Sequence, residues 1–142
     1  MKKTKLRKKA KAKSEGWWKN HADDLMQDVH KTMHKNCLVC GGKNEVGHHH
    51  ITKSLSSFLR YNFQNLIPMC RSCHFKHHIS SDPNISSVIQ SKMGPEWVQW
   101  IESVRRNPIK MGILYYKCKV EEFNLILEGS TILSKNMAKS QE

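Results

Sequence analysis

The sequence predicts a small α+β domain in which two pairs of cysteines tie an irregular central segment between helices at either end. Three observations predict this class. Two C-x2-C pairs are separated by residues 41–69. That stretch contains Gly, His and short apolar runs, and it has no helical periodicity. Apolar residues recur at helical spacing both before it and after it.

The beginning of the chain is strongly basic. Residues 1–13 contain eight Lys and Arg residues and no acid, and the whole chain carries a net charge of +12. A run of like charges repels itself and buries little, so residues 1–15 are predicted to form a disordered arm. The charge indicates a polyanionic partner, nucleic acid before an anionic membrane surface, with a merely solvated tail as the alternative. The arm residues expected to contact DNA are Lys2, Lys3, Lys5, Arg7, Lys8 and Lys9.

A first helix is predicted over residues 17–35, where apolar residues recur at near-helical spacing. Asp82-Pro83-Asn84 marks a turn after the cysteine-rich segment. No stretch approaches the roughly 20 apolar residues of a membrane span, and no apolar segment follows the basic N-terminus as in a secretory signal. We therefore expect a cytoplasmic protein without a membrane partner.

A pair of helices is predicted toward the C-terminus. Gly94-Pro95 opens a helix with a Trp-containing apolar stripe, and Asn107-Pro108 ends it. A second amphipathic stretch covers residues 113–127, with Gly129 as its cap, although its first four residues could instead form a strand. The stripes of both helices are typical of a core or a helical hairpin. Residues 129–142 are predicted to be a frayed polar tail.

The cysteine pairs predict a structural zinc site. Cys37 and Cys40 form one pair, and Cys70 and Cys73 form the other. Each pair places two thiolates on one turn, and the chain between them lets the halves meet around one Zn2+. Disulfides are disfavoured because the chain lacks a secretory signal and a disulfide-dense pattern. The fifth cysteine, Cys118, is expected to be a small buried hydrophobe.

Histidines crowd the same segment. The chain has nine, and six lie in or just after the cysteine-rich part, which is unusual for residues that only pack. His74 and His78 stand four positions apart, so on a helix they share one face and can bind one cation. The triplet His48-His49-His50 can present a ligand and a base side by side.

In order along the chain, Cys37-x2-Cys40, His49-His50-Ile51, Asn65 and Cys70-x2-Cys73-His74-x3-His78 resemble an HNH endonuclease of the zinc-stapled type. The segments Leu59-Arg60-Tyr61-Asn62 and Asn65 to Cys70 are similar to phage nucleases, including NinG/Rap recombination proteins. The resemblance covers roughly residues 37–128. It implies a ββα-metal finger at 37–80 with a helical extension at 84–128, inside a nuclease domain of residues 16–128.

The resemblance also implies roles for individual residues. His50 would be the general base, His49 a metal ligand next to it, and Asn65 would orient the base. His74 and His78 would complete the catalytic metal site, and Arg60 would join the residues that contact DNA. The four paired cysteines would hold the structural Zn2+, and Mg2+ or Mn2+ is expected at the catalytic site.

Two assignments stay open. The triplet offers a second register, with His48 as the ligand and His49 as the base. The spacing to Asn65 from His50 matches colicin-like nucleases, whereas the spacing from His49 is closer to that of NinG. His77 is adjacent to His78 and could replace it as the last ligand, although the four-residue spacing favours His78.

The expected function is a metal-dependent DNA endonuclease from a phage or mobile element, acting in recombination, repair or packaging, with a homodimer left open. The main alternative is a non-catalytic zinc-finger DNA-binding protein on the same scaffold, which would need only the cysteines. A third hypothesis is a zinc module that docks a protein through the helix of Trp97 and Trp100.

Overall fold

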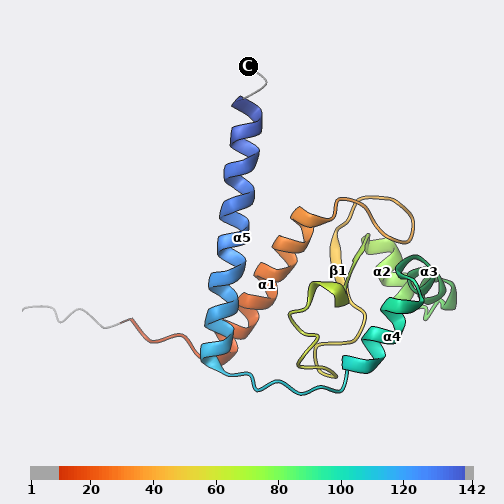
Figure 1. Ribbon diagram of the computed structural model, residues 1–142, viewed down its shortest axis with the longest axis horizontal. Helices are drawn as coiled ribbons and strands as arrows, with labels where there is room; N and C mark the ends of the chain where they lie inside the picture. Colours follow the sequence, from red (N-terminus) through yellow and green to blue (C-terminus); the bar gives the residue numbers. More distant parts are fainter. Residues whose placement is uncertain (1–9, 140–142) are drawn as a thin grey trace, which may run out of the picture.

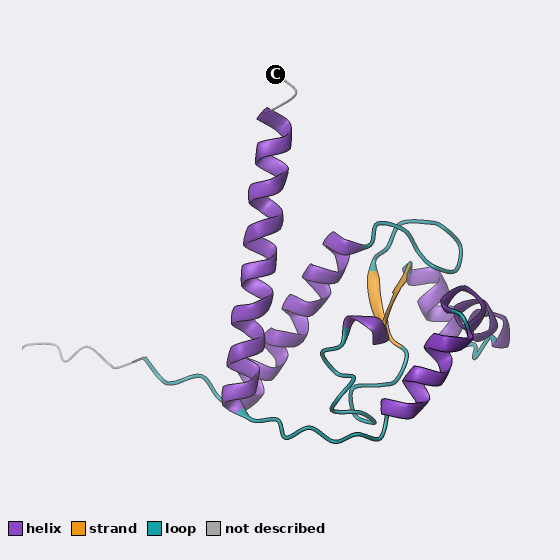
Figure 2. Cartoon of the chain, in the orientation of Figure 1, coloured by secondary structure: helices purple, strands orange, loops and turns teal. Residues whose placement is uncertain are grey.

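The computed structural model describes residues 10–139 and shows a mixed α+β protein with five helices and one two-stranded antiparallel sheet (Figures 1 and 2). In chain order the elements are α1 (Glu15–Met33), β1 (Val46–His49), the 3-10 turn η1 (Phe63–Asn65), β2 (Leu66–Met69), α2 (Arg71–His78), α3 (Pro83–Met93), α4 (Pro95–Val104) and α5 (Ile113–Lys139). The helices at 15–33 and 95–104 match the sequence predictions closely.

Helix α1 presents two different faces to the rest of the molecule. It begins at Ser14, whose Oγ accepts the N–H of Trp17 at 3.2 Å and satisfies one free donor of the first turn. Ala22, Met26 and Val29 form a buried apolar stripe at helical spacing. A second stripe, displaced by one residue, is polar: Asp23, Gln27 and His30.

The sheet is short, and its register fixes which side chains face α2. Strands β1 and β2 are antiparallel, with His48 opposite Ile67 and His49 opposite Leu66. The N–H of His50 continues the ladder by donating to the carbonyl of Asn65 at 2.9 Å. Helix α2 begins two residues after β2, so β1, β2, α2 and the segments between them form one hairpin–helix unit, residues 46–78.

Helix α3 is absent from the sequence prediction. Asp82-Pro83-Asn84 was expected to be a turn, but it is the start of this helix: Asp82 caps it by accepting the N–H of Asn84 at 3.0 Å, and Pro83 occupies the first turn. The same residue types favour turns and helix starts, because both need a side-chain acceptor and a fixed φ. Ile85 and Ile89 of α3 pack on the cysteine-bearing part of the molecule.

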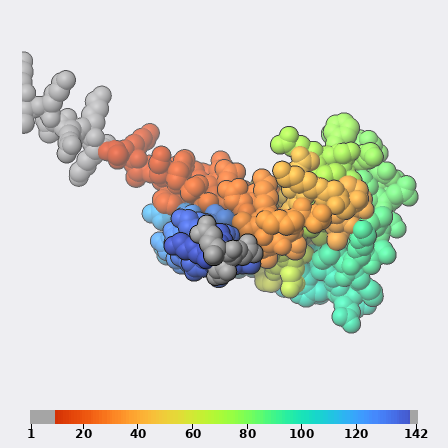
Figure 3. Space-filling view, turned by 90° about the horizontal axis from the view of Figure 1, so that it is seen from above, coloured from red at the N-terminus to blue at the C-terminus, as the bar shows by residue number. Residues whose placement is uncertain are grey.

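Helix α5 corrects three expectations. It packs along α1 and does not form a hairpin with α4 (Figure 1). Its first residues are helical, so the strand alternative at 113–116 is wrong, and the helix passes through Gly129 to Lys139 without capping there. Figure 3 shows α5 nearly end-on beside α1, with the later green segments on the far side of α1.

Three hydrophobic clusters hold the described residues together. The first joins α1 and α5 through Met26, Val29 and Phe123. The second surrounds the cysteines with residues of β2 and α3, and the third packs α4 on the segment between the strands. Trp97 and Trp100 are half-buried against these last clusters, which supports a core role for their helix rather than the docking of a protein partner.

Candidate metal centre and histidine pocket

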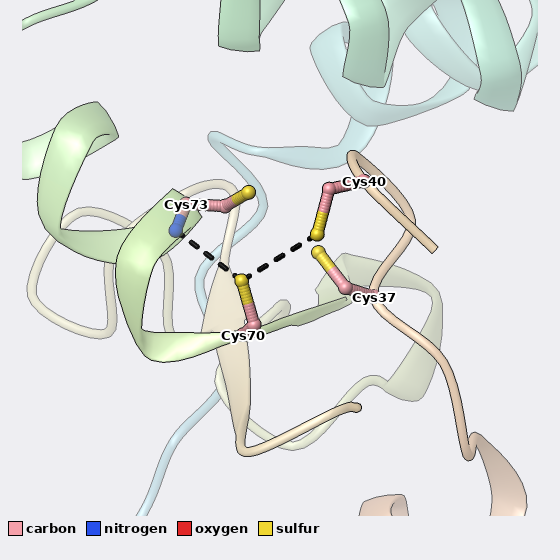
Figure 4. A group of neighbouring side chains, drawn as sticks. All are labelled: Cys37, Cys40, Cys70 and Cys73. Carbon is pink, nitrogen blue, oxygen red and sulfur yellow. Dashed lines mark hydrogen bonds between the residues drawn. The ribbon is translucent and has the colours of Figure 1, made fainter. Parts of the chain in front are cut away.

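Four cysteine sulfurs converge at the start of α2 (Figure 4). The Sγ atoms of Cys37, Cys40, Cys70 and Cys73 all lie within 4.8 Å of one another, and we call them the cysteine cluster. The Sγ atoms of Cys40 and Cys70 are 3.6 Å apart. Tetrahedral zinc with Zn–S bonds of about 2.3 Å requires sulfur separations of about 3.8 Å, whereas a disulfide requires about 2.05 Å. The four cysteines therefore fit a structural metal such as zinc.

The backbone around each cysteine pair explains this convergence. The N–H of Cys37 donates to the carbonyl of Gly42 at 2.6 Å, which closes a tight turn, and Gly41 adopts a left-handed φ of 76° within it. The N–H of Leu38 donates to the carbonyl of Pro68 at 2.7 Å and ties that turn to β2. Cys70 then caps α2, and its sulfur accepts the N–H of Cys73 at 3.4 Å.

The electrostatics of the cluster differ between its members. Burial acts to raise the pKa of the Cys37 thiol, but backbone hydrogen bonds from Cys40 and Cys70 outweigh it and lower the pKa to about 7. Burial raises the pKa of Cys73 above its ordinary value. Since metal binds the thiolate, the lowered pKa of Cys37 favours metal binding at neutral pH. Cys118 is exposed on α5, so the expectation that it is buried is wrong.

A second group of candidate ligands consists of histidines. Ring nitrogens of His48, on β1, and of His74 and His78, on α2, lie within 4.8 Å of one another. We call these three residues the histidine cluster. His78 Nε2 is 3.1 Å from His48 Nδ1. The cluster forms because α2 follows β2 directly, so successive turns of the helix face the side of β1 that carries His48.

Burial keeps two members of the histidine cluster, His48 and His74, neutral. Burial, and then charge on His77 and His78, lower the pKa of His48 to about 3. Burial also lowers the pKa of His74. Neutral imidazole is the form that binds a cation, so the lowered pKa values of His48 and His74 favour cation binding at neutral pH. His77 contacts the His48 ring at 4.8 Å between centroids but is not among the three converging residues.

His49 and His50 occupy different environments. His49 Nε2 is 3.0 Å from the carbonyl oxygen of Arg60, and His49 lines an open pocket of about 330 Å³ together with the histidine cluster. The His50 ring lies against Trp97, with 4.8 Å between the ring centroids. The buried Nδ1 atom of His50 has no hydrogen-bond partner among residues 10–139. Burial lowers the pKa of both residues. The structure therefore brings His48, and not His49, to His74 and His78, as in the second of the two registers.

Asn65 is fully buried and closes the loop between the strands. Its Oδ1 accepts the N–H of Ile51 at 2.8 Å, and its Nδ2 donates to the carbonyls of Ile51 at 2.9 Å and Leu59 at 3.2 Å. Both donors of the amide are therefore used within this loop. Because the loop also carries the Arg60 carbonyl that contacts His49, Asn65 holds the partner of that ring in place.

Arg60, which was predicted to contact DNA, is buried and paired within the protein. Its side chain is 8% exposed and forms a two-pronged ion pair with Asp23 of α1, with Nε 3.2 Å from Oδ1 and a second bond from Nη2 to Oδ2. Burial and pairing commit the Arg60 guanidinium to Asp23, and its contact with DNA stays a prediction. The six arm residues predicted to contact DNA lie outside the described residues.

The contribution of α1 to the open pocket lined by His49 and the histidine cluster was not predicted from the sequence. The Gln27 side chain bonds the backbone of Gly47 twice, accepting its N–H at 2.8 Å and donating to its carbonyl at 2.9 Å. This fixes β1 directly before His48. A polar stripe beside an apolar stripe in α1 was the available signal, but a polar stripe on a helix is ordinarily solvated.

Comparison of the chain with protein-family models, with curated proteins and with solved structures finds no match. None of the helices within residues 10–139 is long and apolar enough to cross a membrane.

Proposed function

We propose that this chain is a metal-dependent endonuclease of the HNH type that hydrolyses DNA phosphodiester bonds. One observation carries the proposal: the ring nitrogens of three histidines converge, beside a fourth histidine whose ring contacts a backbone carbonyl. The β1–β2–α2 order and the cysteine cluster agree with the expected zinc-stapled ββα-metal finger. A pure DNA-binding module would need the cysteines alone.

The histidine cluster would hold the catalytic cation. A divalent ion bound by neutral ligands keeps most of its charge, which would offset the negative charge that develops on the phosphoryl and departing 3′ oxygens. Imidazole ligands do not select one metal strongly, and availability favours Mg2+ or Mn2+. The structural Zn2+ would be separate, at the cysteine cluster.

His49 is the proposed general base. When its Nε2–H donates to the Arg60 carbonyl, the opposite nitrogen, Nδ1, carries the lone pair that accepts a proton from the attacking water. Asn65 would act as a positioning residue, because it fixes the loop that supplies this carbonyl. Hydrolysis should leave a 5′-phosphate and a 3′-hydroxyl, as the family resemblance implies. His50 remains the alternative base.

The decisive experiment is cleavage of supercoiled plasmid and of a branched junction with Mg2+ or Mn2+. His49→Ala should lose roughly 10²- to 10⁴-fold in rate while retaining fold and DNA affinity, and excess metal should not rescue it. His74→Ala should be partly rescued by excess Mn2+. His21→Ala, on α1, is the control for loss of a histidine outside the pocket.

Three outcomes would change the assignment. If His50→Ala is the variant that metal cannot rescue and His49→Ala cleaves normally, the base is His50. If the wild-type protein binds DNA tightly but cleaves none with any divalent cation, the protein is the non-catalytic zinc-finger binder. If alanine variants of His48, His49 and His50 all cleave normally, the HNH assignment is wrong. The phage or mobile-element origin stays a prediction from the resemblance.

A further inference from the structure

A second pocket lies against the histidine cluster, and the proposed reaction leaves it without an occupant. It measures about 550 Å³ and is lined by His74 and His78 together with Glu45, Val46, Arg71, Phe75 and Ile79. His74 and His78 also line the pocket that contains His48 and His49. A ligand group in the second pocket would therefore be a direct neighbour of a group bound at the histidine cluster.

Two large apolar side chains in this pocket face solvent. Phe75 on α2 is 59% exposed, and Ile79, four positions later at the C-cap of that helix, is 69% exposed. Neither belongs to the three hydrophobic clusters found among residues 10–139. An exposed aromatic and an exposed branched residue next to a polar site are typical of a surface that binds a flat apolar group.

One exposed guanidinium of the pocket, that of Arg71, can meet an anionic ligand. Among the described residues that line it, the only acid, Glu45, is already engaged: its Oε2 accepts the N–H of Arg71 at 2.9 Å and its Oε1 lies 3.9 Å from Arg71 Nε. The Arg71 side chain is 86% exposed, and Lys76 on the same helix is exposed as well. The pocket thus combines two exposed apolar side chains with one exposed guanidinium, beside the candidate cation site.

A nucleotide has this combination of chemistry, since it joins a flat base to an anionic phosphate. We infer that Phe75 and Ile79 bind the base of the nucleotide next to the scissile phosphate, with Arg71 near the following phosphate. This inference rests on the proposed nuclease function and names its substrate class. A base inside a continuous duplex is stacked on both faces, so the base on Phe75 must be unpaired. The preferred substrate is therefore DNA with an unpaired nucleotide at the cleavage site, as in a branch or a single strand.

The first test measures binding of a labelled single-stranded oligonucleotide and of its blunt duplex by fluorescence anisotropy, without added divalent cation. Phe75→Ala should weaken single-strand binding by about 5- to 100-fold, the range for losing one base–aromatic stack, and leave duplex binding nearly unchanged. Phe75→Trp should restore single-strand binding. Leu114→Ala removes a comparably exposed apolar side chain, 72% exposed, from α5 and should change neither affinity.

Equal affinities of wild type and Phe75→Ala for the single strand would overturn the inference, and so would equal losses on both DNA forms. The second test compares cleavage of a branched junction that has unpaired nucleotides at its branch point with cleavage of a linear duplex. Wild type should prefer the junction, and Phe75→Ala should reduce this preference. If wild type cleaves both equally, the inference fails while the nuclease function stands. If it cleaves neither, the nuclease function fails, and the binding comparison still decides whether Phe75 holds a base.

Discussion

The ion pair of Asp23 and Arg60 connects α1 to the loop that carries the carbonyl partner of His49. Both side chains are largely buried, at 13% and 8% exposure, and Lys53 Nζ also lies 3.1 Å from Asp23. Taking charges out of water is costly, so such a pair adds little stability over an apolar pair, but breaking it leaves an uncompensated charge. Loss of the Asp23 carboxylate would therefore leave the buried guanidinium of Arg60 without its counter-ion.

Asp23→Ala should lower the free energy of unfolding by about 3 kcal/mol, because Arg60 stays buried without a counter-ion. Glu122→Ala is the matched control, since it removes a carboxylate paired with Lys119 on the exposed face of α5. It should cost less than about 1 kcal/mol. Urea denaturation of the three proteins measures both changes, and similar costs for the two variants would contradict a special role for the buried pair.

His30 gives the fold a specific pH dependence. His30 is fully buried. Its burial and, as the next largest cause, charge on His34 lower its pKa to about 4. Between pH 6.5 and 4 the unfolded chain binds a proton at this residue and the folded chain does not, so stability falls as the pH falls through this window. The contribution is about 1.4 kcal/mol for each pH unit.

Between about pH 6.5 and about pH 5 the unfolding free energy of His30→Gln should therefore fall by less than that of the wild type. The difference should be roughly 2 kcal/mol, which corresponds to the uptake of about one proton on unfolding. Urea denaturation at several pH values measures the slope for both proteins. Because the other buried histidines are present in both, the same slope in the two proteins would show that His30 is not the residue responsible.

The sequence predicted which residue types are candidate metal ligands. It did not decide which histidine of the triplet would be the ligand and which the base. Cys37, Cys40, Cys70 and Cys73 could be predicted because each pair lies on one turn, where spacing alone decides whether sulfurs meet. The His48-His49-His50 triplet lies at the end of a strand, where consecutive side chains point to opposite faces and a shift of one residue exchanges ligand and base. Only the pairing of β1 with β2 decides this, and pairing depends on contacts distant in the sequence.

At the scale of elements, the positions of helices in the sequence were predicted better than the elements on which the helices pack. Capping residues and apolar spacing are local signals, so α1 and α4 could be located within a few residues. The partner of α5 could not, because the apolar stripe containing Val120 and Phe123 fits any apolar surface of similar width. Helix α3 was missed because Asp82-Pro83 is equally typical of a turn.

The packing of α5 on α1 depends on Phe123, which is fully buried against α1 residues and Tyr61. Phe123→Ala should lower the free energy of unfolding by about 3–5 kcal/mol through reduced burial and a residual cavity. Leu125→Ala, two residues along the same helix and 67% exposed, should change it by less than about 0.5 kcal/mol. Thermal or urea denaturation compares them, and equal effects would mean that α5 does not pack on α1 in solution.

At the scale of the whole molecule, the cysteine cluster stabilises one side of the protein. The buried residues around it come from β2 and α3, whereas the described residues that pack between α1 and α5 include no cysteine. Zinc bound by four thiolates contributes directly to folding free energy. We therefore expect metal loss to affect the two sides unequally.

Elemental analysis should find about one zinc per chain. Removing it with a chelator should speed amide hydrogen exchange in β2, α2 and α3 before it does so in α1 and α5, because the latter pair shares its own core. In the zinc-loaded native protein, Cys118 should be the one readily titrated thiol, since it is exposed and outside the cluster. Ready titration of every thiol in the chain would contradict a zinc site.

The basic arm should act on DNA through charge alone. Deleting residues 1–13 removes eight positive charges. DNA binding should weaken, and the slope of log affinity against log salt should become shallower by about 0.9 for each duplex phosphate that the arm neutralises in the full-length protein. Fluorescence anisotropy at several salt concentrations measures the slope, and an unchanged slope would show that the arm does not touch DNA.

Asp23, Gln27 and His30 of α1 all reach the hairpin–helix unit or the segment before it, although α1 precedes both cysteine pairs in the sequence. The unit is therefore not a portable module. A fragment that begins at residue 36, or a graft of residues 37–80 onto another scaffold, would leave the guanidinium of Arg60 and the edge of β1 at Gly47 without partners. Over evolutionary time, positions 23 and 60 should change together, so correlated substitutions would link two segments that lie far apart in the chain.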